Sequence, residues 1–294
     1  MNSVPPPDIF DYRRLSALRA RAASRAASDR FLWRHMADEL FERLADVSRN
    51  FDDILMVGPI GNFAQLILAN RRANVTHLHL SAQTVSEGAD NIIAEDRLIA
   101  SVPGQTDSKA YDLIVSAGTL DSVNDLPGAL IQYRRLLRPD GLFLASLFGG
   151  GSLSALRAAM IKADGNRISP HIHPQIELRN MADLLVRAGF ALPVADIDRI
   201  DIRYRDWRSL VGDLRDMGLG NGLSGARHYL GKDYPARLSA AWDAKAGPDG
   251  KVTETFRFLQ LSGWGPSPTQ PKPAARGSGS VSLAAALQPR KRSD

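Results

Sequence analysis

The 294-residue chain contains no cysteine, and this absence removes several classes of chemistry at once. Disulfide bonds, thiolate zinc sites, cysteine-ligated iron–sulfur clusters and a catalytic thiol are all excluded. The sequence also lacks any run of the roughly 18–20 apolar residues that a membrane-spanning helix requires. Its first residues do not show the basic-then-apolar pattern of a signal peptide. We therefore expect a cytoplasmic protein with no transmembrane segment.

A strong excess of charge of one sign is also missing. The formal net charge of +5 is modest for this length, and the apolar share of 44% is ordinary for a chain that buries a core. The positive side chains nevertheless gather near the two ends, at Arg13, Arg14, Arg19, Arg21 and Arg25 and at Arg290, Lys291 and Arg292. Such ends attract nucleic acid, an acidic protein or an anionic membrane surface, although solvated helix faces and a soluble tail explain them more simply. We expect no specific nucleic-acid partner.

Short apolar runs that alternate with helical patterns begin at residue 53. This alternation is typical of an α/β fold, in which helices cover both faces of a mostly parallel sheet. The predicted strands are 54–57, 75–80, 91–94, 112–116, 142–148, 191–197, 200–204 and 253–263, with a turn at Pro139-Asp140-Gly141. The predicted helices are 63–69, 126–137, 153–163, 176–188, 207–217 and 234–244.

The chain before residue 53 predicts two further helices. The first, at 15–27, is rich in Ala and Arg, which favour helix. The second follows Ser28-Asp29, a predicted N-cap, and carries apolar residues at helical spacing, namely Leu32, Met36, Leu40, Leu44 and Val47. From residue 266 the composition shifts to Pro, Gly, Ser and Ala, which is typical of a flexible tail.

Three regions follow from these patterns. We expect an N-terminal helical extension at 1–52, an α/β domain at 53–265 and a flexible tail at 266–294. Helical insertions in the domain are expected at about 153–188 and 205–246.

The turn after the first predicted strand is where a doubly wound sheet binds nucleotide-like cofactors. Here it reads Gly58-Pro59-Ile60-Gly61. The two glycines allow a ligand to approach the backbone closely, whereas Pro59 removes one N–H donor. The turn therefore indicates either a cofactor site or simply a tight connection.

Polar residues near the ends of later strands are the other candidates around this turn. The second strand ends near Ser81, without the carboxylate that would hold a ribose. Glu95-Asp96, after the third strand, is an acidic pair that suits the edge of an adenine, and an exposed loop explains it equally well. We expect Asp112 to accept hydrogen bonds from neighbouring loop backbone.

Two histidines, His171 and His173, occupy a proline-bounded segment that does not read as helix. With a carboxylate such as Asp164 or Glu177 they would suit a non-haem iron or zinc site. Residues two apart on an extended segment point in opposite directions, however, so we expect no metal site here. His171 is our candidate for acid–base chemistry or substrate contact, and polar loop histidines are the simpler interpretation.

Several stretches between residues 9 and 283 are shared with one family. They include Asp112–Ser116, Val123–Pro127, Leu137–Phe143, Phe148–Gly150, Ser169–Ile172, Leu185–Phe190, Gly263-Trp264 and the tail Ala275–Ser282. In these stretches the chain resembles the methyltransferase-like assembly factors of respiratory complex I, within the class I S-adenosylmethionine-dependent methyltransferases. The Pro139-Asp140-Gly141 strand entry is generic among methyltransferases, whereas Ser169–Ile172 and the tail are more specific.

This resemblance implies a seven-stranded sheet with an antiparallel last strand and an S-adenosylmethionine pocket at its carboxyl edge. Contacts to that cofactor are then expected from Gly58, Gly61, Ser81, Glu95, Asp96, Ser116, Ala117 and Gly118. The eukaryotic members are associated with hydroxylation of an arginine on a complex I subunit. More distant relatives methylate a malonyl group bound to a carrier protein.

The chain departs from the family pattern at three places. Met56–Gly61 replaces an Asp-Leu-Gly-Cys-Gly-type loop, Ser81 replaces the ribose-binding acid, and Asp121-Ser122 replaces a His-Trp pair. The cofactor loop is therefore degenerate. Losing one buried hydrogen-bonding carboxylate lowers ligand affinity by roughly 1–3 kcal/mol.

The leading hypothesis is a methyltransferase-family protein, most simply an enzyme, that acts on a protein subunit in complex I assembly. One alternative is a conventional S-adenosylmethionine-dependent methyltransferase of a small molecule or carrier protein. The other is a non-catalytic scaffold that kept the fold and the partner surface. The sequence does not determine the oligomeric state.

Overall fold

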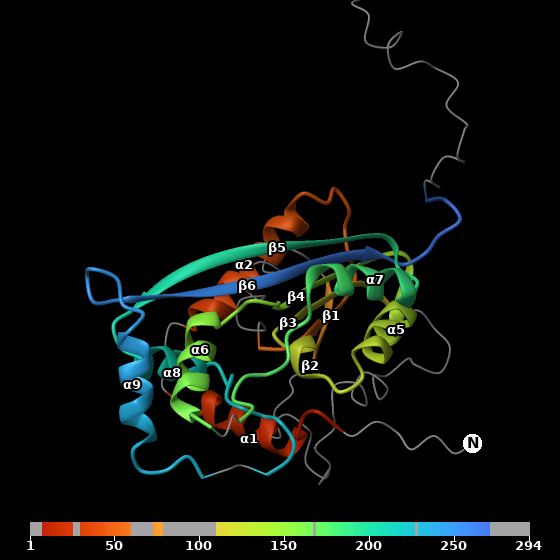
Figure 1. The fold of residues 1–294 in the computed structure, drawn as a ribbon. Coiled ribbons are helices and arrows are strands. Elements are labelled where there is room, and N and C mark those ends of the chain that lie inside the picture. Colours follow the sequence, from red (N-terminus) through yellow and green to blue (C-terminus); the bar gives the residue numbers. More distant parts are fainter. Residues whose placement is uncertain are drawn as a thin grey trace, which may run out of the picture.

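The computed structural model describes residues 8–25, 30–59, 73–78, 110–166, 169–226 and 229–270. These residues form a six-stranded sheet in the order β2-β1-β3-β4-β6-β5 (Figure 1). The strands are β1 (Asp53–Val57), β2 (Asn74–Leu78), β3 (Tyr111–Ala117), β4 (Leu137–Phe148), β5 (Ala191–Tyr204) and β6 (Val252–Trp264). The first four are parallel, and β6 is antiparallel to both of its neighbours. The predicted α/β class and the antiparallel last strand are confirmed.

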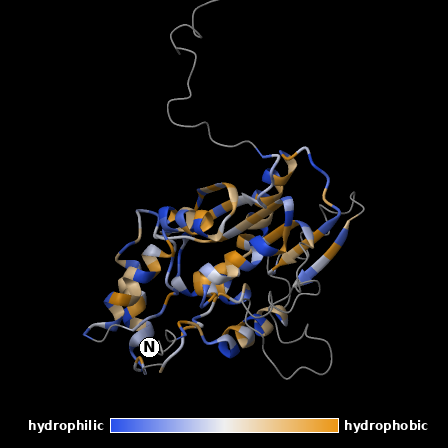
Figure 2. Cartoon of the chain, turned by 90° about the vertical axis from the view of Figure 1, so that its right-hand side faces the viewer, coloured by the Kyte–Doolittle hydropathy of each residue, from blue (hydrophilic) through white to orange (hydrophobic). Residues whose placement is uncertain are grey.

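Helices cover both faces of this sheet, and the two faces have separate apolar cores. The helices are α1 (Tyr12–Ala23), α2 (Phe31–Ala45), α5 (Leu126–Leu136), α6 (Ser154–Asp164), α7 (Leu178–Ala188), α8 (Trp207–Asp216) and α9 (Tyr234–Asp243). One core joins the sheet to α2, α6, α8 and α9, and the other joins it to α5 and α7. Strand β6 contributes Phe256 and Phe258 to the first and Leu259 and Leu261 to the second, as strand alternation predicts. Figure 2 shows that both the strands and the helices around them carry hydrophobic residues.

The predicted apolar stripe of α2 packs against the sheet. Leu32, Met36 and Leu40 are fully buried. The predicted start of the helix was wrong, because Arg30, rather than Ser28 or Asp29, is the N-cap residue. Arg30 adopts a left-handed backbone conformation and makes no side-chain cap.

Two predicted boundaries on the strands also differ from the structure. Pro139-Asp140-Gly141 is not a separate turn before β4 but an irregularity within it, because backbone hydrogen bonds to Gly265 continue across it. Strand β5 is continuous, whereas the sequence predicted two strands. Its antiparallel partner β6 pairs with every position from 194 to 204, so the ladder leaves no break at 198–199.

Several predicted features lie outside the described residues, among them the strand at 91–94, the helix at 63–69, the glycine Gly61 and the tail from residue 271.

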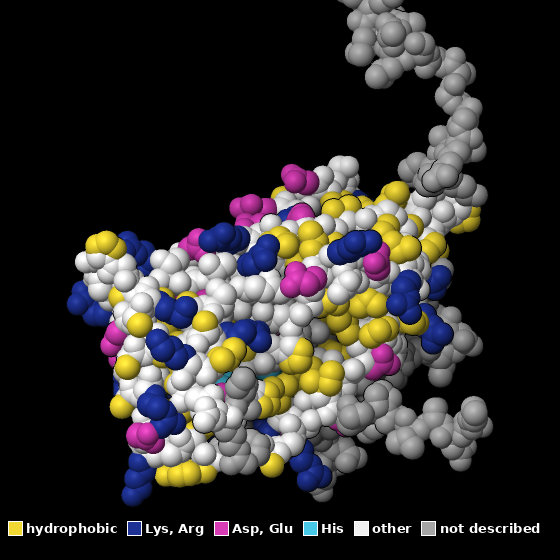
Figure 3. Space-filling model, viewed as in Figure 1, with side chains coloured by type: hydrophobic (Ala, Val, Ile, Leu, Met, Phe, Trp, Pro, Cys, Tyr) yellow, Lys and Arg dark blue, Asp and Glu magenta, His cyan; other side chains and the backbone are white. Residues whose placement is uncertain are grey.

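Some hydrophobic side chains in the described part of the chain reach the surface. On the face shown in Figure 3 they gather over α5, α7 and the start of β5. The exposed members there are Ile131, Val186, Leu192 and Val194. Exposed hydrophobics of this kind are common singly, and a group of them is a feature of interaction surfaces.

Candidate functional site

A cavity of about 300 Å³ opens at the carboxyl ends of β1 and β3. Gly58 follows β1, Gly118 follows β3, and both line it together with Thr119. Its other walls come from α1, α2, the 3-10 turn at Leu120–Ser122 and the segment that follows α8. The carboxyl edge of a parallel sheet is the usual ligand-binding position of such folds.

Of the eight predicted cofactor contacts, four lie outside the described residues: Gly61, Ser81, Glu95 and Asp96. Gly58 and Gly118 line the cavity, whereas Ser116 and Ala117 are buried in the strand end and do not line it. The Ser116 hydroxyl instead lies 3.0 Å from the Thr119 hydroxyl. Thr119 is thus a cavity residue that the sequence did not single out.

Position 58 requires a glycine because two strands lie very close together there. Its φ is +105°, a conformation that side chains with a Cβ rarely adopt. A Cβ at this position would lie 2.1 Å from the carbonyl oxygen of Ala117. The glycine therefore permits β1 and β3 to end side by side at the rim of the cavity.

Position 118 requires a glycine because an aromatic ring from the N-terminal extension packs against it. A Cβ on Gly118 would lie 1.9 Å from the Trp33 ring, which packs closely against the backbone there. The Trp33 indole N–H donates to the carbonyl of Met217, 3.2 Å away. Helix α2 therefore contributes a cavity wall, which no local sequence signal indicated.

A half-buried acid, Asp121, lines the first cavity. Asp121 replaces a member of the family's His-Trp pair, and burial raises its pKa while the positive charge of Arg19 opposes that rise. Arg19 reaches in from α1 and donates to the Ser122 hydroxyl, 2.8 Å away. The departure at 121 thus introduces a carboxylate into the site, and α1 brings the guanidinium of Arg19 close to it.

A second cavity, of about 230 Å³, adjoins the first. Asp121, His173 and Leu219 line both. The rest of its lining is largely apolar and includes Phe148, Leu153, Leu156, Met160, Ile172, Val211 and Leu214. The two cavities therefore meet at the carboxylate of Asp121 and the imidazole of His173.

His171, the predicted acid–base residue, lines the second cavity. Its Nε2 lies 2.9 Å from one carboxylate oxygen of Asp164, a side chain with no exposed surface. The Tyr234 hydroxyl is 3.4 Å from the same nitrogen. Burial, followed by the charge of Asp164, raises the pKa of Tyr234 to about 12, so this hydroxyl stays protonated. A carboxylate that is hydrogen-bonded to one imidazole nitrogen orients the ring for proton transfer at its other nitrogen.

His173 has a different environment from His171. Its Nε2 accepts a hydrogen bond from the backbone N–H of Gly222, 2.9 Å away, and its ring meets that of Phe10 edge-on. Burial, reinforced by the positive charge of Arg19, lowers the pKa of His173 to about 4. His173 is therefore a neutral hydrogen-bonding group near pH 7.

The buried imidazole predicts a pH dependence of stability. The pKa of His173 is about 4 in the folded chain against an ordinary 6.5, so its contribution is complete above pH 6.5 and is lost as the pH falls toward 4. The loss amounts to at most about 3 kcal/mol. Urea unfolding from pH 8 to pH 4 should show a steeper loss for the wild type than for His173→Asn, which cannot take up a proton. Parallel curves for the two proteins would contradict the assignment.

Comparison with known proteins identifies the architecture around these cavities. A family model described as a methyltransferase domain matches residues 26–193. The chain belongs to the methyltransferase-domain family. The matched methyltransferase region includes α2, the carboxyl ends of β1 and β3, and both histidines. The predicted family resemblance is confirmed.

The relatives of this methyltransferase-family chain include two kinds of protein. The mitochondrial arginine-hydroxylase NDUFAF5 of Danio rerio is 30% identical over 272 residues, which cover 86% of this chain and 81% of that protein. The Homo sapiens NDUFAF5 is 30% identical over 95% of this chain and 77% of its own length. A malonyl-[acyl-carrier protein] O-methyltransferase of Laribacter hongkongensis is 29% identical over 87% of this chain and 90% of its own length. In the part of this methyltransferase-family chain that the structure describes, no helix has the length and apolarity needed to cross a membrane.

Proposed function

We propose that this methyltransferase-family protein is an enzyme that binds S-adenosylmethionine in the first cavity and modifies a side chain of a respiratory complex I subunit during assembly. The second cavity receives that side chain. One observation carries the proposal: a cavity at the carboxyl edge of the sheet adjoins a largely apolar cavity, and Asp121 and His173 line both. A cofactor and an acceptor in these two cavities would meet at polar groups.

The first cavity fits the proposed cofactor in position and in character. Its volume of about 300 Å³ is at the lower end of small-molecule sites. Gly58 and Gly118 bring backbone to its wall without side chains, and Thr119 and Asp121 offer polar groups. S-adenosylmethionine supplies an electrophilic methyl group when bound. The chain's own residues would hold its ends and exclude water.

The second cavity suits an acceptor with an apolar stem and a polar head. An arginine side chain has this form, and the carboxylate of Asp121 matches its positive charge. The relatives named arginine-hydroxylases support this choice of acceptor. His171, oriented by Asp164, would accept or return a proton at the acceptor group. We place this activity in the cytoplasm.

Ligand-induced stabilisation tests the cofactor. S-adenosylmethionine or its demethylated product at 100 times the dissociation constant should add roughly 2.7 kcal/mol to the free energy of unfolding, a shift of a few degrees in Tm. Thermal unfolding of the full chain, with adenosine as the control ligand, measures this. If millimolar S-adenosylmethionine leaves Tm unchanged, the cofactor assignment is wrong.

Two other functions predict different results in turnover experiments. The relative that methylates a carrier-protein-bound malonyl group favours a conventional methyltransferase, which would transfer labelled methyl to a small-molecule or carrier-protein fraction. A non-catalytic scaffold would bind a respiratory subunit without transferring any group. The proposed enzyme requires modification of the subunit itself, which mass spectrometry of the isolated subunit detects.

A further inference from the structure

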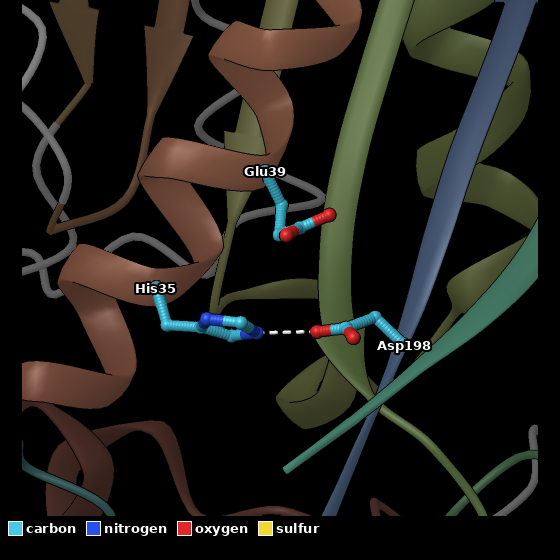
Figure 4. Close-up of side chains that lie close together, drawn as sticks. All are labelled: His35, Glu39 and Asp198. Atoms are coloured by element: carbon cyan, nitrogen blue, oxygen red, sulfur yellow. Dashed lines mark hydrogen bonds and ion pairs between the residues drawn. The ribbon is translucent and has the colours of Figure 1, made fainter.

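His35, Glu39 and Asp198 form a compact, half-buried cluster between α2 and the edge strand β5 (Figure 4). His35 and Glu39 are four residues apart on α2, so both side chains lie on one helix face. Asp198 projects toward them from β5 and is hydrogen-bonded to the His35 ring. One ligand atom from each residue lies within 4.8 Å of the other two. Within the described ranges, no other group of three such side chains has this spacing.

The charges in this cluster do not balance. An imidazole carries at most one positive charge, and it faces two carboxylates. The nearest basic residue one turn further along α2, Arg43, already makes two hydrogen bonds of 2.9 and 3.0 Å to Asp196. The cluster therefore favours an added cation.

We propose that His35, Glu39 and Asp198 bind a divalent first-row transition-metal ion such as Zn²⁺. One imidazole nitrogen and two carboxylate oxygens are ordinary ligands for such ions, with water completing the coordination. Bonds of about 2.0 Å in a tetrahedral site place the ligand atoms roughly 3.3 Å apart. To bind the ion, these half-buried side chains would rotate and bring ligand atoms that now lie within 4.8 Å of one another to that separation. Mg²⁺ and Ca²⁺ prefer all-oxygen ligands and should bind more weakly.

Such an ion would connect the N-terminal extension to the sheet. Two of its ligands come from α2 and one from β5, and His35 and Asp198 are 163 residues apart in the sequence. Trp33, which forms a wall of the first cavity against Gly118, precedes His35 by two positions on the same helix. Metal binding should therefore stabilise α2, and with it that wall.

Zn²⁺ titration of the untagged full chain tests the site. Calorimetry should give one saturable site per chain, and thermal unfolding should show a Tm that rises with Zn²⁺ concentration. Glu39→Gln and Asp198→Asn should each weaken binding at least tenfold. Asp38→Asn makes the same charge change on the exposed face of α2 and should leave the affinity within twofold of the wild type.

Glu39→Gln also separates metal binding from a purely structural role. It keeps the His35–Asp198 hydrogen bond and removes the crowded charge, so without metal this variant should unfold at the same Tm as the wild type or higher. Weakened Zn²⁺ binding by a variant this stable cannot come from unfolding. The proposal is overturned if the wild type shows no saturable binding at micromolar Zn²⁺. It is equally overturned if Glu39→Gln and Asp198→Asn bind with wild-type affinity, because the ion would then lie elsewhere.

Discussion

Replacing His171 with asparagine is expected to lower turnover of the protein acceptor by about 10²- to 10⁴-fold, the usual contribution of a positioned acid–base group. The imidazole lines the acceptor cavity, and Asp164 holds its Nε2 at 2.9 Å. Asparagine retains a polar side chain of similar reach but cannot carry the proton. The rate of modification of the isolated subunit under saturating cofactor measures the effect.

Cofactor binding provides the control for this variant. His171 does not line the first cavity, so His171→Asn should keep the Tm shift that S-adenosylmethionine produces in the wild type. Tyr234→Phe, which removes only a hydroxyl 3.4 Å from the ring, should reduce turnover far less. If His171→Asn retains turnover within threefold of the wild type, the imidazole is not the proton acceptor.

Replacing Gly58 with valine is expected to destabilise the fold by about 4 kcal/mol. Two costs add here. A residue with a Cβ at a φ of +105° is strained by roughly 1–3 kcal/mol, and overpacking against a neighbour costs a similar amount. The neighbour is the backbone oxygen of Ala117, which cannot move without opening the β1–β3 pair. Urea unfolding of the purified variant measures the loss.

Gly165→Val separates the two costs. Gly165 also has a positive φ, +68°, but no atom lies within 4 Å of the position its Cβ would take. This variant should therefore lose only the backbone part, roughly 1–3 kcal/mol. Equal losses for the two variants would show that the contact with Ala117 is unimportant. A stability loss at Gly58 also means that loss of activity in its variants is not by itself evidence of cofactor contact.

Much of the fold could be predicted because its signals are local. The apolar runs that became β1, β3 and β4 are buried on both faces, and a parallel sheet covered by helices requires such runs. The stripe of Leu32, Met36 and Leu40 predicted which face of α2 is buried. Gly58 could be chosen because a tight strand-to-helix turn needs a residue without a side chain. These inferences depend only on neighbours within one or two turns of the chain.

Other assignments needed the tertiary structure, because their partners are distant in the sequence. Glu254 is buried in β6, yet its carboxylate accepts hydrogen bonds from the backbone N–H groups of Ala155 and Leu156 at the start of α6, about 100 residues away. Helix α6 has no side-chain cap of its own, so the strand supplies it. No pattern around either position contains this information.

The candidate site shows the same division. Hydrophobic periodicity and turn chemistry depend on the residues along one element. The sequence by itself therefore determined the α/β class and the strand-end position of the first cavity, and it singled out His171 as a candidate functional residue. Burial and electrostatics depend on which elements pack together. Only the tertiary structure therefore placed Trp33 against Gly118, Arg19 beside Asp121, and His173 where two cavities meet. It likewise brought Asp198 to His35 and Glu39, three residues that the sequence alone gave no reason to associate.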